Sequence, residues 1–190
     1  KFCDAHPGRY ELLTEDRTLL DGRDFHPAWN KLAYARRALV MGGYDAVVCL
    51  DDDILITEPG LDPVYEAIVA NFFQPGGEGR LVLASVDEFV SARVPFNTGV
   101  FALRASPQTL HLIDELFRIG RRLRVLDGHI WLPRISGLWD QDAFAAYIRQ
   151  HGHRLFVLLQ HRVLQSIARS HRSFWQPGDF AAHLTGLAEA

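Results

Sequence analysis

Short blocks of apolar residues alternate along the chain with longer stretches in which apolar residues recur every three or four positions. The short blocks are rich in valine, leucine and alanine, which is typical of buried strands. The longer stretches have the spacing of amphipathic helices. We expect helices at 27–41, 63–73, 107–122 and 140–150, and strands at 9–14, 45–50, 81–86, 96–104, 154–159 and 180–184.

Strands that alternate with helices predict an α/β domain in which helices cover both faces of a mainly parallel sheet. The helix at 27–41 has clear boundaries, because Pro27 favours a first helical turn and Gly42-Gly43 ends the periodic stretch. The chain contains no internal repeat and no second domain boundary. We therefore expect one domain that spans residues 1–190.

Three consecutive carboxylates, Asp51, Asp52 and Asp53, end the apolar block at 45–50, and apolar residues resume directly after them. Burying an ionised carboxylate without a partner is strongly unfavourable, so these side chains must lie in a loop or share a cation. An Asp-x-Asp pair at the carboxyl end of an α/β strand is well placed to hold a divalent metal that carries a phosphate. The alternative is a solvated acidic turn.

Three further polar motifs have structural explanations when each is taken alone. The first opens the strand at 96–104 and is typical of a turn. The second starts the helix at 140–150 and is explained by helix capping. The third is a histidine in the last apolar block, where a core residue is commoner than a ligand. In order, the motifs are Asn97-Thr98-Gly99, Asp140-Gln141-Asp142 and His183.

Taken in order, these motifs resemble those of the nucleotide-sugar glycosyltransferases of the GT-A fold. The likeness is strongest to family 34, the galactosyl-, mannosyl- and xylosyltransferases, and family 8 is similar in style. It covers nearly the whole chain and rests on the ordered set, not on any single motif. The matching segments are Trp29-Asn30-Lys31, Tyr44 to Ile56, Asn97 to Arg104, Asp140 to Ala143, Gln160 to Ser166 and Gly178 to Gly186.

The resemblance implies a Rossmann-like GT-A domain that transfers a hexose or pentose from a nucleotide-diphosphate sugar to a glycan hydroxyl, with retention of the anomeric configuration. The departing phosphate would take the proton of the acceptor in a front-face attack. The cofactor would be Mn²⁺ or Mg²⁺, which prefers carboxylate and imidazole ligands. The implied metal ligands are Asp51, Asp53 and His183; the donor-binding residues are Asp51, Asp52, Lys31, Asn97, Thr98, Gly99 and Gly186; the catalytic residues are Asp140, Gln141 and Asp142.

Aromatic side chains offer a separate hypothesis for the acceptor. Their faces suit the apolar faces of sugars, although core packing would explain them equally well. The residues concerned are Trp131, Trp139, Phe174 and Trp175, and of these we assign only Trp175 to the acceptor.

Two features depart from the family pattern. Relatives usually carry a lysine shortly after the C-terminal His-x-x-Gly, whereas no lysine follows His183-Leu-Thr-Gly186 here. The absence of that charge would weaken stabilisation of the leaving diphosphate. The first strand, which normally contributes the pocket for the nucleotide base, is also expected to be missing, because residues 1–6 look like the helix that follows it.

Two other function classes stay open. A haloacid-dehalogenase-like phosphatase also ends a strand in Asp-x-Asp, but its chemistry needs a lysine downstream. The two lysines of this chain, Lys1 and Lys31, both lie upstream of the acidic turn. A non-catalytic domain that binds nucleotide sugar or glycan is the other alternative, motivated by the missing strand and lysine.

Composition limits the partners. A net charge of −3 provides no electrostatic footprint for nucleic acid. The partners that the resemblance implies are a UDP- or GDP-linked sugar and a glycan acceptor. No apolar run approaches the roughly 18 residues of a membrane span. Any membrane anchor would therefore lie outside these residues, and the likeness to family 34 implies the Golgi lumen and a type II membrane protein for the full-length parent.

Overall fold

The computed structural model describes residues 1–14, 17–20, 25–86, 96–127, 139–160, 162–167 and 175–184. Its helices are α1 (Phe2–Ala5), the 3₁₀ helix η1 (Pro27–Trp29), α2 (Asn30–Met41), α3 (Pro63–Ile68), the π-helix η2 (Val69–Phe73), α4 (Pro107–Asp127) and α5 (Asp140–His151). Its strands are β1 (Ala46–Leu50), β2 (Ile54–Ile56), β3 (Val82–Val86), β4 (Phe96–Arg104), β5 (Phe156–Leu159), β6 (Ser166–Ile167) and β7 (Ala181–His183). Among the described residues, no helix combines the length and the apolar character that crossing a membrane requires.

The strands form a four-stranded sheet in the order β1-β4-β3-β5 and a three-stranded sheet in the order β2-β7-β6. In the larger sheet β4 runs antiparallel to both of its neighbours, β1 and β3, and β3 runs parallel to β5. The sheet is therefore mixed, and the prediction of a mainly parallel sheet is not confirmed. The reason is that β3 and β4 pair directly although only nine residues separate them in the chain, fewer than the dozen or more that a crossover between parallel neighbours needs.

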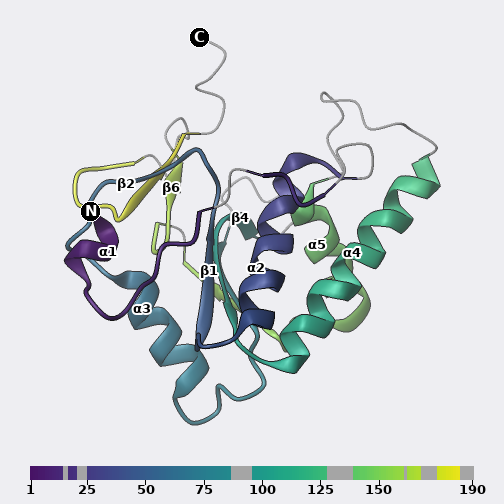
Figure 1. Cartoon of the computed structure of the whole chain (residues 1–190), viewed down its shortest axis with the longest axis horizontal. Coiled ribbons are helices and arrows are strands. Elements are labelled where there is room, and N and C mark those ends of the chain that lie inside the picture. The colour runs from purple at the N-terminus through teal and green to yellow at the C-terminus, as the bar shows by residue number, and fades with distance from the viewer. Residues whose placement is uncertain are drawn as a thin grey trace.

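Helices cover both faces of the larger sheet (Figure 1), with α2, α4 and α5 on one side and α3 on the other. Successive residues of a strand point to opposite faces. In β4, Phe101 and Leu103 belong to the hydrophobic cluster under α2, α4 and α5, while Val100 and Ala102 belong to the cluster on the side of α3. All four are fully buried. The α/β class and the central sheet are thus confirmed.

Most of the expected elements are present, with small shifts at their ends. The strand expected at 9–14 is wrong, because the structure has no strand there. Side chains hold this segment instead: the Tyr10 hydroxyl donates to Asp62 Oδ1 at 2.6 Å, and Arg9 donates to Asp62 Oδ2 at 3.2 Å. Strands β2 and β6 were not predicted, since runs of three and two residues carry no detectable periodicity.

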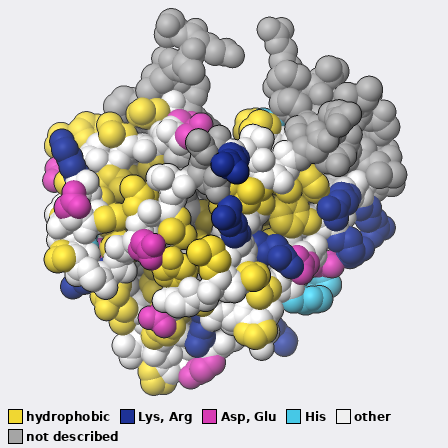
Figure 2. All heavy atoms as spheres, viewed as in Figure 1, with side chains coloured by type: hydrophobic (Ala, Val, Ile, Leu, Met, Phe, Trp, Pro, Cys, Tyr) yellow, Lys and Arg dark blue, Asp and Glu magenta, His cyan; other side chains and the backbone are white. Residues whose placement is uncertain are grey.

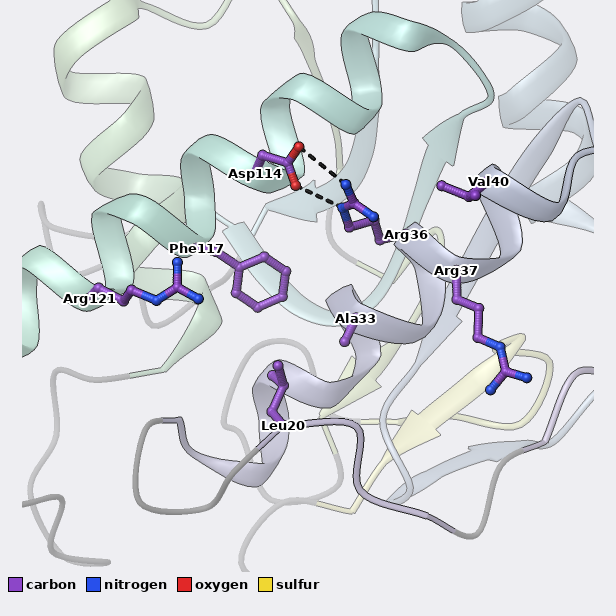
Figure 3. Close-up of a pocket in the computed structure, with 8 residues that line it drawn as sticks. All are labelled: Leu20, Ala33, Arg36, Arg37, Val40, Asp114, Phe117 and Arg121. Carbon is purple, nitrogen blue, oxygen red and sulfur yellow. Dashed lines mark hydrogen bonds and ion pairs between the residues drawn. The ribbon is translucent and has the colours of Figure 1, made fainter.

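The outer surface of α2 and α4 is basic. Figure 2 shows Lys and Arg side chains in a band over these two helices, beside hydrophobic side chains. Two of the arginines are neutralised locally, because Arg36 pairs with Asp114 across the helices and Arg118 pairs with Glu115 within α4. Figure 3 shows Arg36 and Asp114 facing one another between the helices. The band is a solvated helix surface on the outside of the domain.

The contact of η1 with α4 depends on a glycine. Trp29 is 2% exposed, and its ring packs against Phe117 with 5.7 Å between ring centroids. A Cβ on Gly120 would lie 2.3 Å from Trp29 Cη2. Only a residue without a side chain allows the indole to lie so close to the helix.

We expect Gly120→Ala to lower the free energy of unfolding by about 1–2 kcal/mol. Overpacking a filled core costs about 1–3 kcal/mol, and the better helix propensity of alanine offsets up to about 1 kcal/mol of this. Urea denaturation measures the difference. Gly79→Ala is the control, since no atom lies within 4 Å of its new Cβ. An unchanged midpoint for Gly120→Ala would show that the Trp29 ring moves aside freely.

Candidate metal centre

The turn at 51–53 carries the chain from the larger sheet to the smaller one. The Asp51 N–H extends the pairing of β1 with β4 by donating to the Gly99 carbonyl at 2.8 Å. The Ile54 N–H donates to the Asp51 carbonyl at 3.2 Å and closes the turn just before β2. Because both ends of the turn are held by backbone bonds, its side chains are fixed at the carboxyl end of β1.

Strand β7 places His183 beside this turn. It pairs antiparallel with β2, with His183 opposite Ile54, and the Leu184 N–H donates to the Asp53 carbonyl at 2.9 Å. His183 Nε2 lies 3.1 Å from Asp53 Oδ1. The imidazole is buried, whereas the Asp53 side chain is 40% exposed. The site therefore has a buried side at His183 and a solvent-accessible side at Asp53.

Asp51, Asp53 and His183 each offer one ligand atom, and these atoms lie within 4.8 Å of one another. Within the described ranges, this is the one group of three or more His, Cys, Asp or Glu side chains that could hold a metal ion. Two carboxylate oxygens and one imidazole nitrogen make a donor set that could hold a divalent metal ion. The structure thus brings together the three residues that the resemblance implied.

Lys31 occupies the centre of a buried ion cluster next to these ligands. Its ammonium donates to Asp51 Oδ1 at 2.6 Å and to the Thr98 carbonyl at 2.9 Å, and it lies 3.2 Å from Asp140 Oδ2. The three N–H donors of an ammonium thus face three acceptors. In this arrangement Lys31 holds Asp51, Thr98 and Asp140 together. The predicted contact between Lys31 and the donor would require one of these bonds to break.

Burial controls the charges in this cluster. Burial raises the pKa of Asp140 to about 6, although the Lys31 ammonium lowers it. Burial likewise raises the pKa of Asp51 against the opposing effect of Lys31. For Lys31 itself, burial lowers the pKa, but the two carboxylates outweigh burial and the pKa is raised overall. One ammonium thus serves two carboxylates, and with Asp53 beside them the site favours an added cation.

The first residues of β4 are held by side-chain amides. The Thr98 N–H donates to Gln141 Oε1 at 3.2 Å. Asn97 Oδ1 accepts from the Gly99 N–H at 2.6 Å and from Gln165 Nε2 at 2.8 Å. The predicted motifs at 97–99 and 140–142 are therefore in contact with one another and with the lysine.

Of two further predicted site residues, Asp142 has a structural role and Asp52 is exposed to solvent. Asp142 Oδ2 accepts from the Trp139 N–H at 3.2 Å, so Asp142 caps α5 as the structural explanation of its motif requires. Asp52 is exposed on the turn between the two metal-ligand candidates.

The predicted acceptor contact lies away from the ion cluster. Trp175 Nε1 donates to Thr57 Oγ1 at 3.0 Å, directly after β2. Gly186, predicted to bind the donor, lies outside the described residues.

The sequence analysis assigned no role to Trp139 and did not identify His26. Trp139 precedes Asp140 directly, is 46% exposed, and lies 4.3 Å from the ring of His26. Tryptophan is highly buried on average, so half-exposed rings beside a polar cluster are suited to binding a ligand. No pattern marked His26, because it lies in a polar stretch and meets Trp139 only in the folded chain.

Gln165 lies in the matching segment Gln160 to Ser166, but the resemblance implies no role for it. It is 5% exposed and lies between Asn97 and His183, close to Gly99. A lone glutamine in a short apolar segment carries no signal that sequence alone can use.

Comparison with known proteins supports the architecture. No family model and no curated protein matches the chain. Among solved structures, the chain is similar to a glycosyltransferase involved in the glycosylation of the major capsid of PBCV-1. The TM-score is 0.60 at 15% sequence identity, over 97% of this chain and 81% of that one. The two proteins share a fold.

Replacing Lys31 with methionine should lower the free energy of unfolding by about 3–5 kcal/mol near neutral pH, because two buried carboxylates lose their cation. Chemical denaturation measures the loss. Lys1→Met is the matched control, since Lys1 is the other lysine of the chain and its side chain is fully exposed. A loss below about 1 kcal/mol, the range of a surface ion pair, would contradict the burial of the cluster.

The raised pKa of Asp140 predicts a pH dependence of definite sign. Its carboxyl binds the proton more tightly in the folded chain, with a pKa of about 6 against 3.8 for the ordinary group. Its contribution to stability is complete below the unfolded pKa and is lost as the pH rises through the folded pKa. Relative to Asp140→Asn, the metal-free protein should lose on the order of 3 kcal/mol between about pH 4 and pH 7. Urea unfolding in EDTA measures both proteins, and parallel pH profiles would contradict the raised pKa.

Proposed function

We propose that the chain is a metal-dependent glycosyltransferase that moves a hexose or pentose from a nucleotide-diphosphate sugar to a glycan hydroxyl, with retention. The observation that carries the proposal is the cluster of Asp51, Asp53 and His183 at the carboxyl end of β1, in a fold shared with a glycosyltransferase. Its mixed oxygen and nitrogen donor set fits Mn²⁺ best, with Mg²⁺ as the alternative.

When bound, the cation would supply Lewis-acid stabilisation of the charge on the departing diphosphate. The protein groups around it have separate tasks. Lys31 holds Asp51 in place through their 2.6 Å bond. Asp140 is almost fully buried, so it acts on Lys31 and not on the sugar. Gln141 is half-buried and anchored to Thr98, which leaves its amide available to a sugar hydroxyl near the anomeric carbon.

In the proposed reaction, the bond between the anomeric carbon and the phosphate oxygen breaks, and a bond from the acceptor oxygen forms on the same face. The acceptor proton passes to the departing phosphate oxygen. Two carboxylates that a covalent route would need are already engaged, because Asp140 is paired with Lys31 and Asp142 caps α5. This engagement favours front-face attack over a covalent glycosyl–protein intermediate.

The acceptor sugar is proposed to stack on an aromatic side chain at the rim of the site. Trp139 is half-exposed and adjoins Asp140. Trp175 stays a second proposal, because its indole N–H is already bonded to Thr57.

The two alternative functions make different predictions for the same site. A phosphatase of the haloacid-dehalogenase type would place Asp51 as a nucleophile beside Lys31, and their 2.6 Å contact is compatible with that chemistry. The mixed sheet and the fold shared with a glycosyltransferase favour transfer instead. A non-catalytic domain would bind nucleotide sugar without turnover.

Calorimetric titration of UDP and GDP, first with Mn²⁺ and then with EDTA, tests the proposal. We expect one nucleotide to bind with Mn²⁺ and not with EDTA. Asp51→Asn and Asp53→Asn should each weaken that binding by more than the roughly 10–100-fold that losing an outer-shell partner of a metal costs. Asp45→Asn, an exposed aspartate just before β1, is the matched control.

Equal binding in EDTA would overturn the metal dependence. Release of phosphate from p-nitrophenyl phosphate, abolished by Asp51→Asn, would assign the phosphatase chemistry. Nucleotide-sugar binding without hydrolysis of the donor or transfer to any glycan would assign the non-catalytic role.

A further inference from the structure

Among the described residues, three buried side-chain atoms near the candidate metal centre have no hydrogen-bond partner: Asp140 Oδ2, His183 Nδ1 and Gln165 Oε1. Asp140 Oδ2 lies 3.2 Å from the Lys31 ammonium, which leaves the atoms of His183 and Gln165 to be explained. His183 is 4% and Gln165 5% exposed, so neither atom can turn to bulk water. Leaving a buried polar atom unpaired costs about 1–3 kcal/mol. Such atoms therefore point to an arrangement in which each gains a partner.

Gly99 keeps the space between these two atoms open. A Cβ built on Gly99 would lie 2.6 Å from Gln165 Oε1 and 2.8 Å from His183 Nδ1. Both atoms thus border the same small volume, which any other residue at position 99 would fill. The two atoms form no hydrogen bond as they stand, so the pairing requires a side-chain adjustment that brings Oε1 to Nδ1.

The hydrogen bonds at the start of β4 determine which way the Gln165 amide points. A backbone N–H can only donate, so the atom of Asn97 that faces the Gly99 N–H at 2.6 Å must be its oxygen. The group of Gln165 that faces the same oxygen at 2.8 Å must then be its NH₂. Gln165 Oε1 is therefore the atom left to face His183.

An acceptor opposite Nδ1 selects one tautomer of the imidazole. If Gln165 Oε1 accepts a proton from Nδ1, the neutral ring carries its hydrogen there and has a free lone pair on Nε2. Nε2 lies 3.1 Å from Asp53 Oδ1, so without a metal this carboxylate competes with Gln165 for the hydrogen of the ring. Histidines that bind metals commonly donate their other N–H to an oxygen in this way, which orients the ring and makes it a stronger ligand.

We propose that Gln165 is a positioning residue for the metal centre: its Oε1 accepts the hydrogen of His183 Nδ1 and thereby directs the Nε2 lone pair toward Asp51 and Asp53. The inference rests on the proposed metal-dependent function for its purpose, but its hydrogen-bond geometry is independent of which reaction the site performs. A relay runs from the Gly99 N–H through Asn97 and Gln165 to His183. The relay couples the start of β4 to β7, two segments of different sheets.

The first test is the hydrogen position on His183 in the metal-free Asp53→Ala protein at mildly alkaline pH, where the competing carboxylate is removed. Two-bond ¹H–¹⁵N correlation spectra distinguish the tautomers, and the His183 signal is identified by its loss when His183→Asn is added. We expect the hydrogen on Nδ1 in Asp53→Ala and a shift toward Nε2 when Gln165→Met is added. A ring with its hydrogen on Nε2 in Asp53→Ala would overturn the proposal without reference to metal binding.

The second test is the affinity for Mn²⁺ alone, measured by calorimetry. Gln165→Met should weaken binding by about 10–100-fold, the usual effect of removing an outer-shell partner. Gln165→Glu keeps an acceptor for Nδ1 but loses the NH₂ that donates to Asn97, so it should weaken binding less than Gln165→Met, whereas a purely structural role of the amide would make both variants equally weak. Gln150→Met, an exposed position near the end of α5, is the control for the substitution.

The outcomes separate this inference from the proposed function. Equal Mn²⁺ affinity in the wild type and Gln165→Met would overturn the inference and leave the metal centre standing. No Mn²⁺ binding by the wild type would overturn the proposed function, and the tautomer measurement would still decide the role of Gln165. If Gln165→Met does not fold, the tautomer in Asp53→Ala and the affinity of Gln165→Glu decide it.

Discussion

The site depends on the contacts of the Lys31 ammonium, which is buried between Asp51, Thr98 and Asp140. It joins the first turn of α2 to the carboxyl end of β1, to the start of β4 and to the start of α5. Four segments far apart in the chain must therefore reach their final positions together. Because removing one member leaves a buried charge unpaired, the cluster makes this end of the fold cooperative and holds Asp51 where a cation can reach it.

A second constraint holds the histidine side of the site. Asp179, which is buried, accepts from the guanidinium of Arg162, the hydroxyl of Ser166 and the N–H of Gln176. These bonds tie the segment before β6 and the segment before β7 into one unit, because Asp179 lies two residues ahead of β7. The position of His183 next to the acidic turn thus depends on a local polar network as well as on the pairing of β7 with β2.

Where sequence reasoning succeeded, it relied on signals that are local. The long helices at 27–41, 107–122 and 140–150 were visible from spacing and boundaries, and the apolar block that ends in carboxylates was visible from composition. It failed where the decision was not local. The segment at 9–14 has strand-like alternation, yet Asp62 binds its side chains and no strand pairs with it. The mixed order of the sheet escaped prediction, because strand direction depends on how β3 and β4 meet.

The sequence by itself determined the α/β class, the acidic turn, and the histidine and amide motifs that belong with it, because each is a run of residue types within one element. Only the tertiary structure decided that Lys31 faces inward to two carboxylates, and that His183 and Gln165 meet over Gly99. Contacts of this kind join residues from different elements, such as Lys31 and Asp51, 20 positions apart, and Gln165 and Asn97, 68 positions apart. Their partners are chosen by packing and by the requirement that every buried polar group be paired, which no local pattern encodes.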